Sequence, residues 1–165
     1  MNGESKLLRV VLDYDLLLAD ILWPMGQAPG ILPLALKGLI QPAFCVRVLK
    51  NYTRMLSDPN LGLDPEDVVK IIDRINRVGV CVRTRRQSSV HGLNDWDRRL
   101  ISCAVASNAD ALISLTPVRF GHGSIKNVSI LNPADFAKQY MHRFALMDAR
   151  STTKMESPFQ IGDHV

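Results

Sequence analysis

The sequence lacks the cysteine pattern of a zinc site or of a disulfide framework. Its 165 residues include three cysteines, Cys45, Cys81 and Cys103, which lie far apart and form no CxxC pair. An odd number of widely spaced cysteines argues against a disulfide-stabilised secreted scaffold and against structural zinc. We therefore expect three reduced thiols in the core.

Long hydrophobic runs are missing as well. No apolar run approaches the roughly 18 residues that a membrane-spanning helix needs. The leucine-rich segment near the start is interrupted by Asp13, Asp15 and Asp20, so it is neither a membrane helix nor a signal-peptide core. These features predict a cytoplasmic protein without a membrane partner, and the length predicts one domain with its own core.

Charge of one sign is not dominant, since the net charge is +4. The arginines are nevertheless clustered, with Arg83, Arg85 and Arg86 in one group and Arg98 and Arg99 in another. Such groups can contact the phosphates of a nucleic acid, and solvated surface charge is the alternative explanation. Arg98 and Arg99 are therefore candidate RNA contacts.

Apolar segments typical of strands alternate with segments typical of helices. The run LLRVVL predicts a buried parallel strand that ends at Asp13, and further strands are predicted in LIQPAFCV, VCVR, DALISLT and KNVSIL. In the second of these strands, Pro42 favours an edge position or an irregular end. The clearest helix begins at Asp64 as N-cap with Pro65 in the first turn. This alternation predicts an α/β fold with a mainly parallel sheet.

The apolar periodicity fades near the C-terminus. From about residue 148 the segment DARSTTKMESPFQIGDHV shows no helical or strand pattern. We expect one domain over residues 1–147 and a flexible C-terminal tail over residues 148–165.

Acidic and polar residues follow two of the predicted strands. Asp13 ends the first strand with Asp15 two residues later, and Thr116 ends DALISLT. In parallel sheets, ligands bind beyond the carboxyl ends of the strands. Asp97 lies three and four positions before Leu100 and Ile101, so on a helix it shares their inward face, where it can cap the helix or point into a pocket.

Four segments together resemble the PIN-domain family, and within it the toxin components of bacterial toxin–antitoxin pairs. They are VVLDYDLLLADILWP, VLKNYTRMLSDPNLGL, DWDRRLISCAVASNADALISLT and ILNPADF, which together extend from about residue 10 to residue 136. The resemblance implies a three-layer α/β/α fold. It also implies a metal-dependent endoribonuclease that hydrolyses phosphodiester bonds with Mg²⁺ or Mn²⁺, which prefer carboxylate ligands.

The resemblance assigns catalytic and metal-binding roles to Asp13 and Asp97. Two other positions depart from the family pattern, because Asn51 stands where the family has Glu and Thr116 stands where it commonly has Asp. Asp15 replaces the usual Asn. We expect Asp15, Asn51 and Thr116 to contribute weakly or indirectly to a site whose Mg²⁺ or Mn²⁺ is weakly bound or absent.

Three functional hypotheses follow. The first is a PIN-type ribonuclease with weakened or lost catalysis, and the second is a non-catalytic PIN-fold module that binds RNA or protein. A haloacid-dehalogenase-like phosphatase is the third, because its family also begins with a strand followed by Asp-x-Asp. The family resemblance implies RNA, a cognate antitoxin and a second copy of the chain as partners.

Overall fold

The described part of the chain forms one six-stranded sheet. The computed structural model describes residues 6–24, 30–85, 92–121 and 123–148. The strand order is β3-β2-β1-β4-β6-β5, and within the described residues every pairing is parallel except that of β5 with β6. The strands are β1 (Leu8–Leu12), β2 (Ile40–Phe44), β3 (Val80–Cys81), β4 (Ala111–Ile113), β5 (Ser124–Ile125) and β6 (Val128–Leu131). The predicted α/β fold with a mainly parallel sheet is confirmed.

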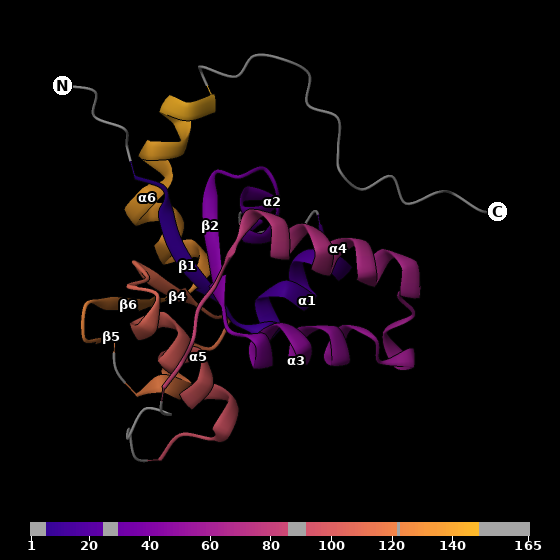
Figure 1. The fold of residues 1–165 in the computed structure, drawn as a ribbon. Coiled ribbons are helices and arrows are strands. Elements are labelled where there is room, and N and C mark those ends of the chain that lie inside the picture. The colour runs from indigo at the N-terminus through magenta and orange to yellow at the C-terminus, as the bar shows by residue number, and fades with distance from the viewer. Residues whose placement is uncertain (1–5, 25–29, 86–91, 122, 149–165) are drawn as a thin grey trace.

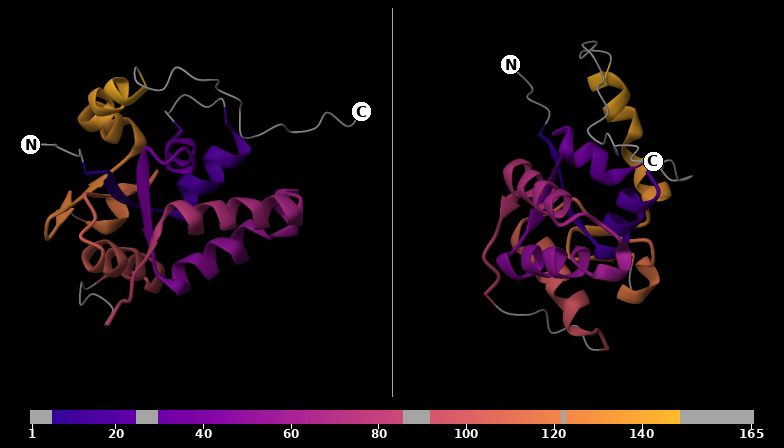
Figure 2. Two further views of the ribbon diagram at one scale, coloured as in Figure 1. Left: turned by 45° about the horizontal axis from the view of Figure 1, so that its top comes forward. Right: turned by 90° about the vertical axis from the view of Figure 1, so that its right-hand side faces the viewer.

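Helices cover the sheet on both sides, which confirms the predicted three layers. Figures 1 and 2 show α6 above and α5 below strands β1, β4 and β6, with α1 to α4 grouped beside β1 and β2. The helices are α1 (Tyr14–Leu22), α2 (Ile31–Leu36), α3 (Val46–Leu56), α4 (Pro65–Val78), α5 (Asp95–Ala106) and α6 (Pro133–Asp148), with short 3₁₀ turns η1 (Pro59–Leu61) and η2 (Pro117–Phe120). None of the described helices is long and apolar enough to cross a bilayer.

Strand β1 lies in the middle of the sheet, and its last three residues are apolar on both faces. Val10, Val11 and Leu12 are at most 1% exposed. β1 pairs with β2 on one side and β4 on the other, and Leu12 is in register with Ile113. The backbone N–H of Asp13 then donates to the carbonyl of Ile113 at 2.9 Å. This register places Asp13 beside the residues that follow β4, at the carboxyl edge of the sheet.

The expectation that Pro42 marks an edge strand is wrong. β2 lies between β1 and β3, and Pro42 is in register with Val10 of β1. A proline is tolerated here because β3 is only two residues long and pairs with Ala43 and Phe44, beyond Pro42.

The predicted helix start at Asp64 agrees with the structure, and α6 begins in a similar way. Asp64 caps α4 and accepts a hydrogen bond from the backbone N–H of Glu66 at 2.8 Å. Asn132 caps α6 in the same way, accepting from the backbone N–H of Asp135 at 2.7 Å. Each side chain satisfies a backbone donor that the first helical turn leaves free.

Two other expectations concern the tail and the cysteines. Helix α6 runs to Asp148, one residue beyond the expected domain boundary, and residues 149–165 of the predicted tail lie outside the described residues. Cys45 and Cys103 are buried as expected. The expectation of a third core thiol is wrong, because Cys81 lies on the short edge strand β3 and is exposed.

Candidate functional site

Asp13 joins the sheet to the first helix and is almost completely buried. It follows β1 directly, caps α1, and has 1% of its surface exposed. Its Oδ1 accepts from the backbone N–H of Tyr14 at 2.8 Å and from the indole Nε1 of Trp96 at 3.0 Å. Its Oδ2 accepts from the hydroxyl of Ser114 at 2.7 Å. A buried carboxylate needs such donors, because burying a charge without partners is costly.

Asp97 points inward from the first turn of α5. The N-cap of this helix is Asn94, whose side chain accepts from the backbone N–H of Asp97 at 2.8 Å. Because Asn94 provides the cap, the carboxylate of Asp97 is free to point into the protein, where the residue is 3% exposed. Of the two alternatives for Asp97, the structure shows the inward one.

Arg119 connects the carboxylates. It lies in η2, and its Nη2 is 2.7 Å from Oδ2 of Asp13 and 2.7 Å from Oδ1 of Asp97. Its Nη1 lies 3.7 Å from Oδ2 of Asp15. The two contacts of 2.7 Å are charge-assisted hydrogen bonds, which are stronger than neutral ones. We call Asp13, Asp15, Asp97 and Arg119 the carboxylate cluster.

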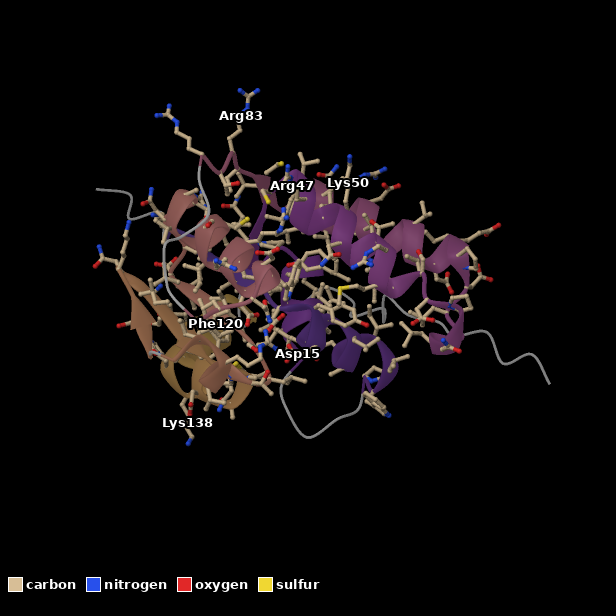
Figure 3. The ribbon with its side chains drawn as sticks, turned by 90° about the horizontal axis from the view of Figure 1, so that it is seen from below. Asp15, Arg47, Lys50, Arg83, Phe120 and Lys138 are labelled. Carbon is tan, nitrogen blue, oxygen red and sulfur yellow. The ribbon has the colours of Figure 1, made fainter. Side chains whose placement is uncertain are left out.

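Thr116 and Asp15 complete this edge of the site. The hydroxyl of Thr116 donates to Oδ2 of Asp15 at 3.2 Å and accepts from Nη1 of Arg119 at 2.9 Å. Asp15 also accepts from the backbone N–H of Leu115 at 3.3 Å. Figure 3 views the molecule from below and labels Asp15. The structure therefore brings Asp15 and Thr116 together with Asp13 and Asp97, as expected.

Asn51 does not join the cluster, contrary to expectation. Its Oδ1 accepts from Nε and Nη2 of Arg54, at 3.2 and 2.9 Å. It lines a pocket between α3 and α5, where Trp96 is a neighbour. Asn51 belongs to α3 and lines this pocket together with Trp96. An Asn51→Glu substitution would therefore add charge to the pocket and not to the cluster.

Two aromatic residues next to predicted positions support the site, and sequence reasoning missed both. Trp96 precedes Asp97 and donates its indole N–H to Asp13, while Tyr52 follows Asn51 and donates its hydroxyl to the carbonyl of Leu12. The two rings meet edge to face, with centroids 6.0 Å apart. Burial raises the pKa of Tyr52 well above its ordinary value, and the charge of Asp13 raises it further. Tyr52 therefore stays a neutral donor.

The carboxylates of the cluster are not free to bind a divalent cation while Arg119 is in place. Asp13 accepts four hydrogen bonds, which is about the capacity of a carboxylate. One guanidinium nitrogen lies between Asp13 and Asp97, in the position that a shared cation would need. Within the described ranges, no group of three or more His, Cys, Asp or Glu residues is arranged to hold a metal ion.

The candidate RNA contacts Arg98 and Arg99 have different surroundings. Arg98 pairs with Asp95 one helical turn away, at 3.2 Å. Arg99 lines the pocket between α3 and α5 together with Arg47 and Asn51. Arg86, in the other arginine group, lies outside the described residues, as does His122.

Cys45 lies at the base of α3, close to this pocket. It occupies the N-cap position of the helix. A hydrogen bond from the Cys103 thiol is the main cause that lowers the pKa of Cys45, to about 5. Burial opposes this shift, whereas the backbone N–H groups of Val48 and Arg47 and the charge of Arg99 add to it. This corner of the molecule therefore stabilises negative charge.

Asp15 gives the first testable prediction. Burial raises its pKa above the ordinary 3.8, and the Asp13 carboxylate raises it further. The folded state then holds this proton to higher pH than the unfolded state does, so the contribution of Asp15 to the free energy of unfolding falls as pH rises through that window. Asp15→Asn removes this pH dependence. We expect the variant to gain stability relative to wild type between about pH 4 and pH 7, by less than about 1 kcal/mol because Asp15 is partly exposed.

Thermal melts of wild type and Asp15→Asn across this pH range test the prediction. The control is Asp73→Asn, at an exposed position of α4. A stability difference that shrinks as pH rises would show that Asp15 is stabilised as an anion and not strained by its neighbours.

Comparison with known proteins identified no relative. Scans against protein-family models, curated proteins and solved structures found no match.

Proposed function

We propose that this chain is a PIN-like protein that binds single-stranded RNA and cleaves it weakly or not at all by a metal-dependent route. The observation that carries the proposal is the guanidinium of Arg119 inside the carboxylate cluster. The cluster has the family's acids at Asp13 and Asp97, yet a protein cation stands between them. Arg119 neutralises part of their charge without supplying a water or a Lewis acid for hydrolysis.

A divalent cation would have to displace Arg119 before it could bind both acids. That displacement breaks two hydrogen bonds of 2.7 Å to carboxylates whose side chains are 1% and 4% exposed. Such bonds lie in a poorly solvated environment, where they are strong. Asn51 adds no negative charge that could favour the metal, because its amide is neutral and its side chain contacts Arg54 outside the cluster. Weak metal binding follows from these contacts.

Support for RNA as the ligand comes from the surface beside the cluster. Helix α3 contains Arg47, Lys50 and Arg54 and no acidic residue, and the three basic residues are exposed. Clustered arginines and lysines favour phosphate contacts, which are the main source of affinity for nucleic acids. A homodimer and a cognate antitoxin belong to the same proposal and rest on the family resemblance, whereas the proposed cytoplasmic location rests on the short apolar runs of the sequence.

The experiment measures binding and cleavage separately. A labelled single-stranded RNA is titrated with wild-type protein in EDTA and in Mn²⁺, and the RNA is then resolved on a denaturing gel. We expect binding in EDTA that weakens steeply with salt, and no cleavage above the level of an Asp13→Asn control. Absence of binding in both conditions would contradict the proposed function.

A metal-dependent endoribonuclease is the second candidate. One observation favours it: three carboxylates face a single arginine, so the cluster has formal negative charge in excess, and the Arg119 side chain is 34% exposed and can move toward solvent. Mn²⁺-dependent cleavage that Asp13→Asn abolishes would select this candidate. The haloacid-dehalogenase-like alternative has less support, because the described contacts of Asp13 include no lysine.

A further inference from the structure

A pocket between α3 and α5 lies on the other side of Trp96 from the carboxylate cluster. Its volume is about 260 Å³, and it is lined by Arg47, Asn51, Asp95, Trp96 and Arg99. This volume is slightly below the range of roughly 300–1,000 Å³ typical of small-molecule pockets. The pocket therefore suits a small group, such as a phosphate with part of its nucleotide, better than a large cofactor.

The charge of the pocket favours an anion. Arg47 and Arg99 form no side-chain ion pair with any residue that the structure describes, whereas Asp95 already pairs with Arg98 at 3.2 Å. Arg99 lies near enough to Cys45 for its charge to contribute to the lowered pKa of that thiol. Together these groups leave the pocket and its surroundings positive, with two guanidinium groups available to a phosphate.

Basic residues continue from the pocket along one edge of the molecule. The backbone N–H of Val82 donates to the carbonyl of Phe44 at 2.8 Å, which places Arg83 next to the start of α3. Figure 3 shows Arg47, Lys50 and Arg83 along the same edge, and all three are exposed. A strip of this kind follows a phosphodiester backbone and not an isolated ion.

Trp96 adds an aromatic surface to this charge. The residue is partly exposed and lines the pocket, while its Nε1 is held by Asp13 at 3.0 Å. Its contact with Tyr52 fixes the ring further. A ring that is held in place and borders a basic pocket is a platform for stacking a base, which contributes to single-strand binding without sequence preference.

We propose that this pocket is a phosphate subsite for single-stranded RNA, in which Arg47 and Arg99 bind one phosphate and Trp96 stacks against the adjacent base. The proposal rests on the RNA binding proposed above and locates it. It also separates binding from the carboxylate cluster, because Arg47 and Arg99 lie outside that cluster. RNA can then be held whether or not the phosphodiester bond is cleaved.

The test compares Arg47→Ala/Arg99→Ala with a control of equal charge loss, Lys70→Ala/Arg77→Ala, at exposed positions of α4. The probe is a labelled oligouridine RNA, and the readouts are the Kd and its salt dependence. We expect at least tenfold weaker binding for the pocket variant, with the salt slope reduced by about 0.7 because the contact with one single-strand phosphate is lost. The control should stay within about twofold of wild type, as expected for residues that make no phosphate contact. Arg47→Ala alone, at an exposed position, repeats the test if the double variant folds poorly.

A second readout reports stacking directly. In a Trp23→Phe background, Trp96 is the remaining tryptophan, because the chain has two. We expect the RNA to quench its fluorescence, and an abasic RNA of the same length to bind more weakly without quenching. Equal loss of affinity in the pocket and control variants, or no quenching on binding, would overturn the subsite while leaving the proposed RNA binding intact. Binding of polyglutamate in place of RNA would overturn both.

Discussion

Replacement of Arg119 by alanine should lower the free energy of unfolding by about 3 kcal/mol in EDTA, because it leaves buried carboxylates without their cation. Arg119 is the described residue whose charge faces all three acids of the cluster. The side chains of Asp13 and Asp97 are 1% and 4% exposed, so water cannot replace the lost contacts well. The effect is at the lower end of the range for breaking a buried pair, because Arg119 itself is 34% exposed.

The same substitution should create a response to Mn²⁺ that wild type lacks. Without Arg119, the carboxylates of Asp13 and Asp97 face the space that its guanidinium filled, with Asp15 farther away, and carboxylate oxygens suit Mn²⁺. Mutual repulsion among them favours any cation that enters. A ligand at about one hundred times its Kd stabilises the folded state by about 2.7 kcal/mol, so saturating Mn²⁺ should restore most of the lost stability.

Urea unfolding of wild type and Arg119→Ala, with EDTA or Mn²⁺, gives both quantities. Arg119→Lys is the conservative variant: it keeps the charge but loses the planar fork that reaches two carboxylates at once. We expect it to fall between wild type and alanine. Arg77→Ala, at an exposed position of α4, controls for the loss of one positive charge. If Mn²⁺ stabilises wild type as strongly as Arg119→Ala, then Arg119 does not compete with the metal.

The centre of the fold could be predicted from the sequence because local patterns and global packing agree there. The residues from Val10 to Leu12 are apolar on both faces, which is the pattern of a strand covered on both sides, and β1 lies at the centre of the sheet. The edges could not be predicted as well. β5 is two residues long and leaves no periodicity that a sequence pattern can reveal, whereas the equally short β3 lies within the predicted strand VCVR.

The acids of the site could be placed, but the cation between them could not. Asp13 and Asp97 have clear local signals, one as the end of a strand and the other as the inward residue of a first helical turn. Arg119 has no such signal, because it lies in a short 3₁₀ turn and reaches Asp13, 106 residues earlier, only after β4 is placed beside β1. Its position three residues after Thr116 is the sequence feature that could have indicated it.

Asn51 shows the limit of carrying over a position from a family pattern. Asn51 lies in helix α3 at the border of its apolar face, where the direction of a side chain depends on its neighbours. Here Arg54, one turn later, holds the Asn51 carbonyl, and Trp96 lies beside it in the pocket. A glutamate at this position would meet the same arginine. Asparagine in place of glutamate at position 51 therefore changes the charge of the pocket more than the charge of the cluster.

The coupling between Asp13 and Arg119 should be the largest pairwise energy that a double-mutant cycle detects in this chain. Asp13→Ala should cost about 3–5 kcal/mol, since it leaves buried donors and one buried cation without their partner. The Asp13→Ala/Arg119→Ala protein should be more stable than the sum of the two single losses predicts, by about 1–3 kcal/mol, because the second substitution removes a charge that the first has already left unpaired.

An exposed pair on α4 provides the matched control for this cycle. Lys70 and Asp67 are 3.6 Å apart, and their side chains are 69% and 65% exposed, so solvent screens them. Their coupling should be below about 0.5 kcal/mol. All variants are compared by urea unfolding in EDTA, where no metal can substitute for Arg119. If the coupling energy of Asp13 and Arg119 is as small as that of the exposed pair, the guanidinium does not lie between the carboxylates in solution. The argument against metal binding, and with it the proposed loss of cleavage, would then fail.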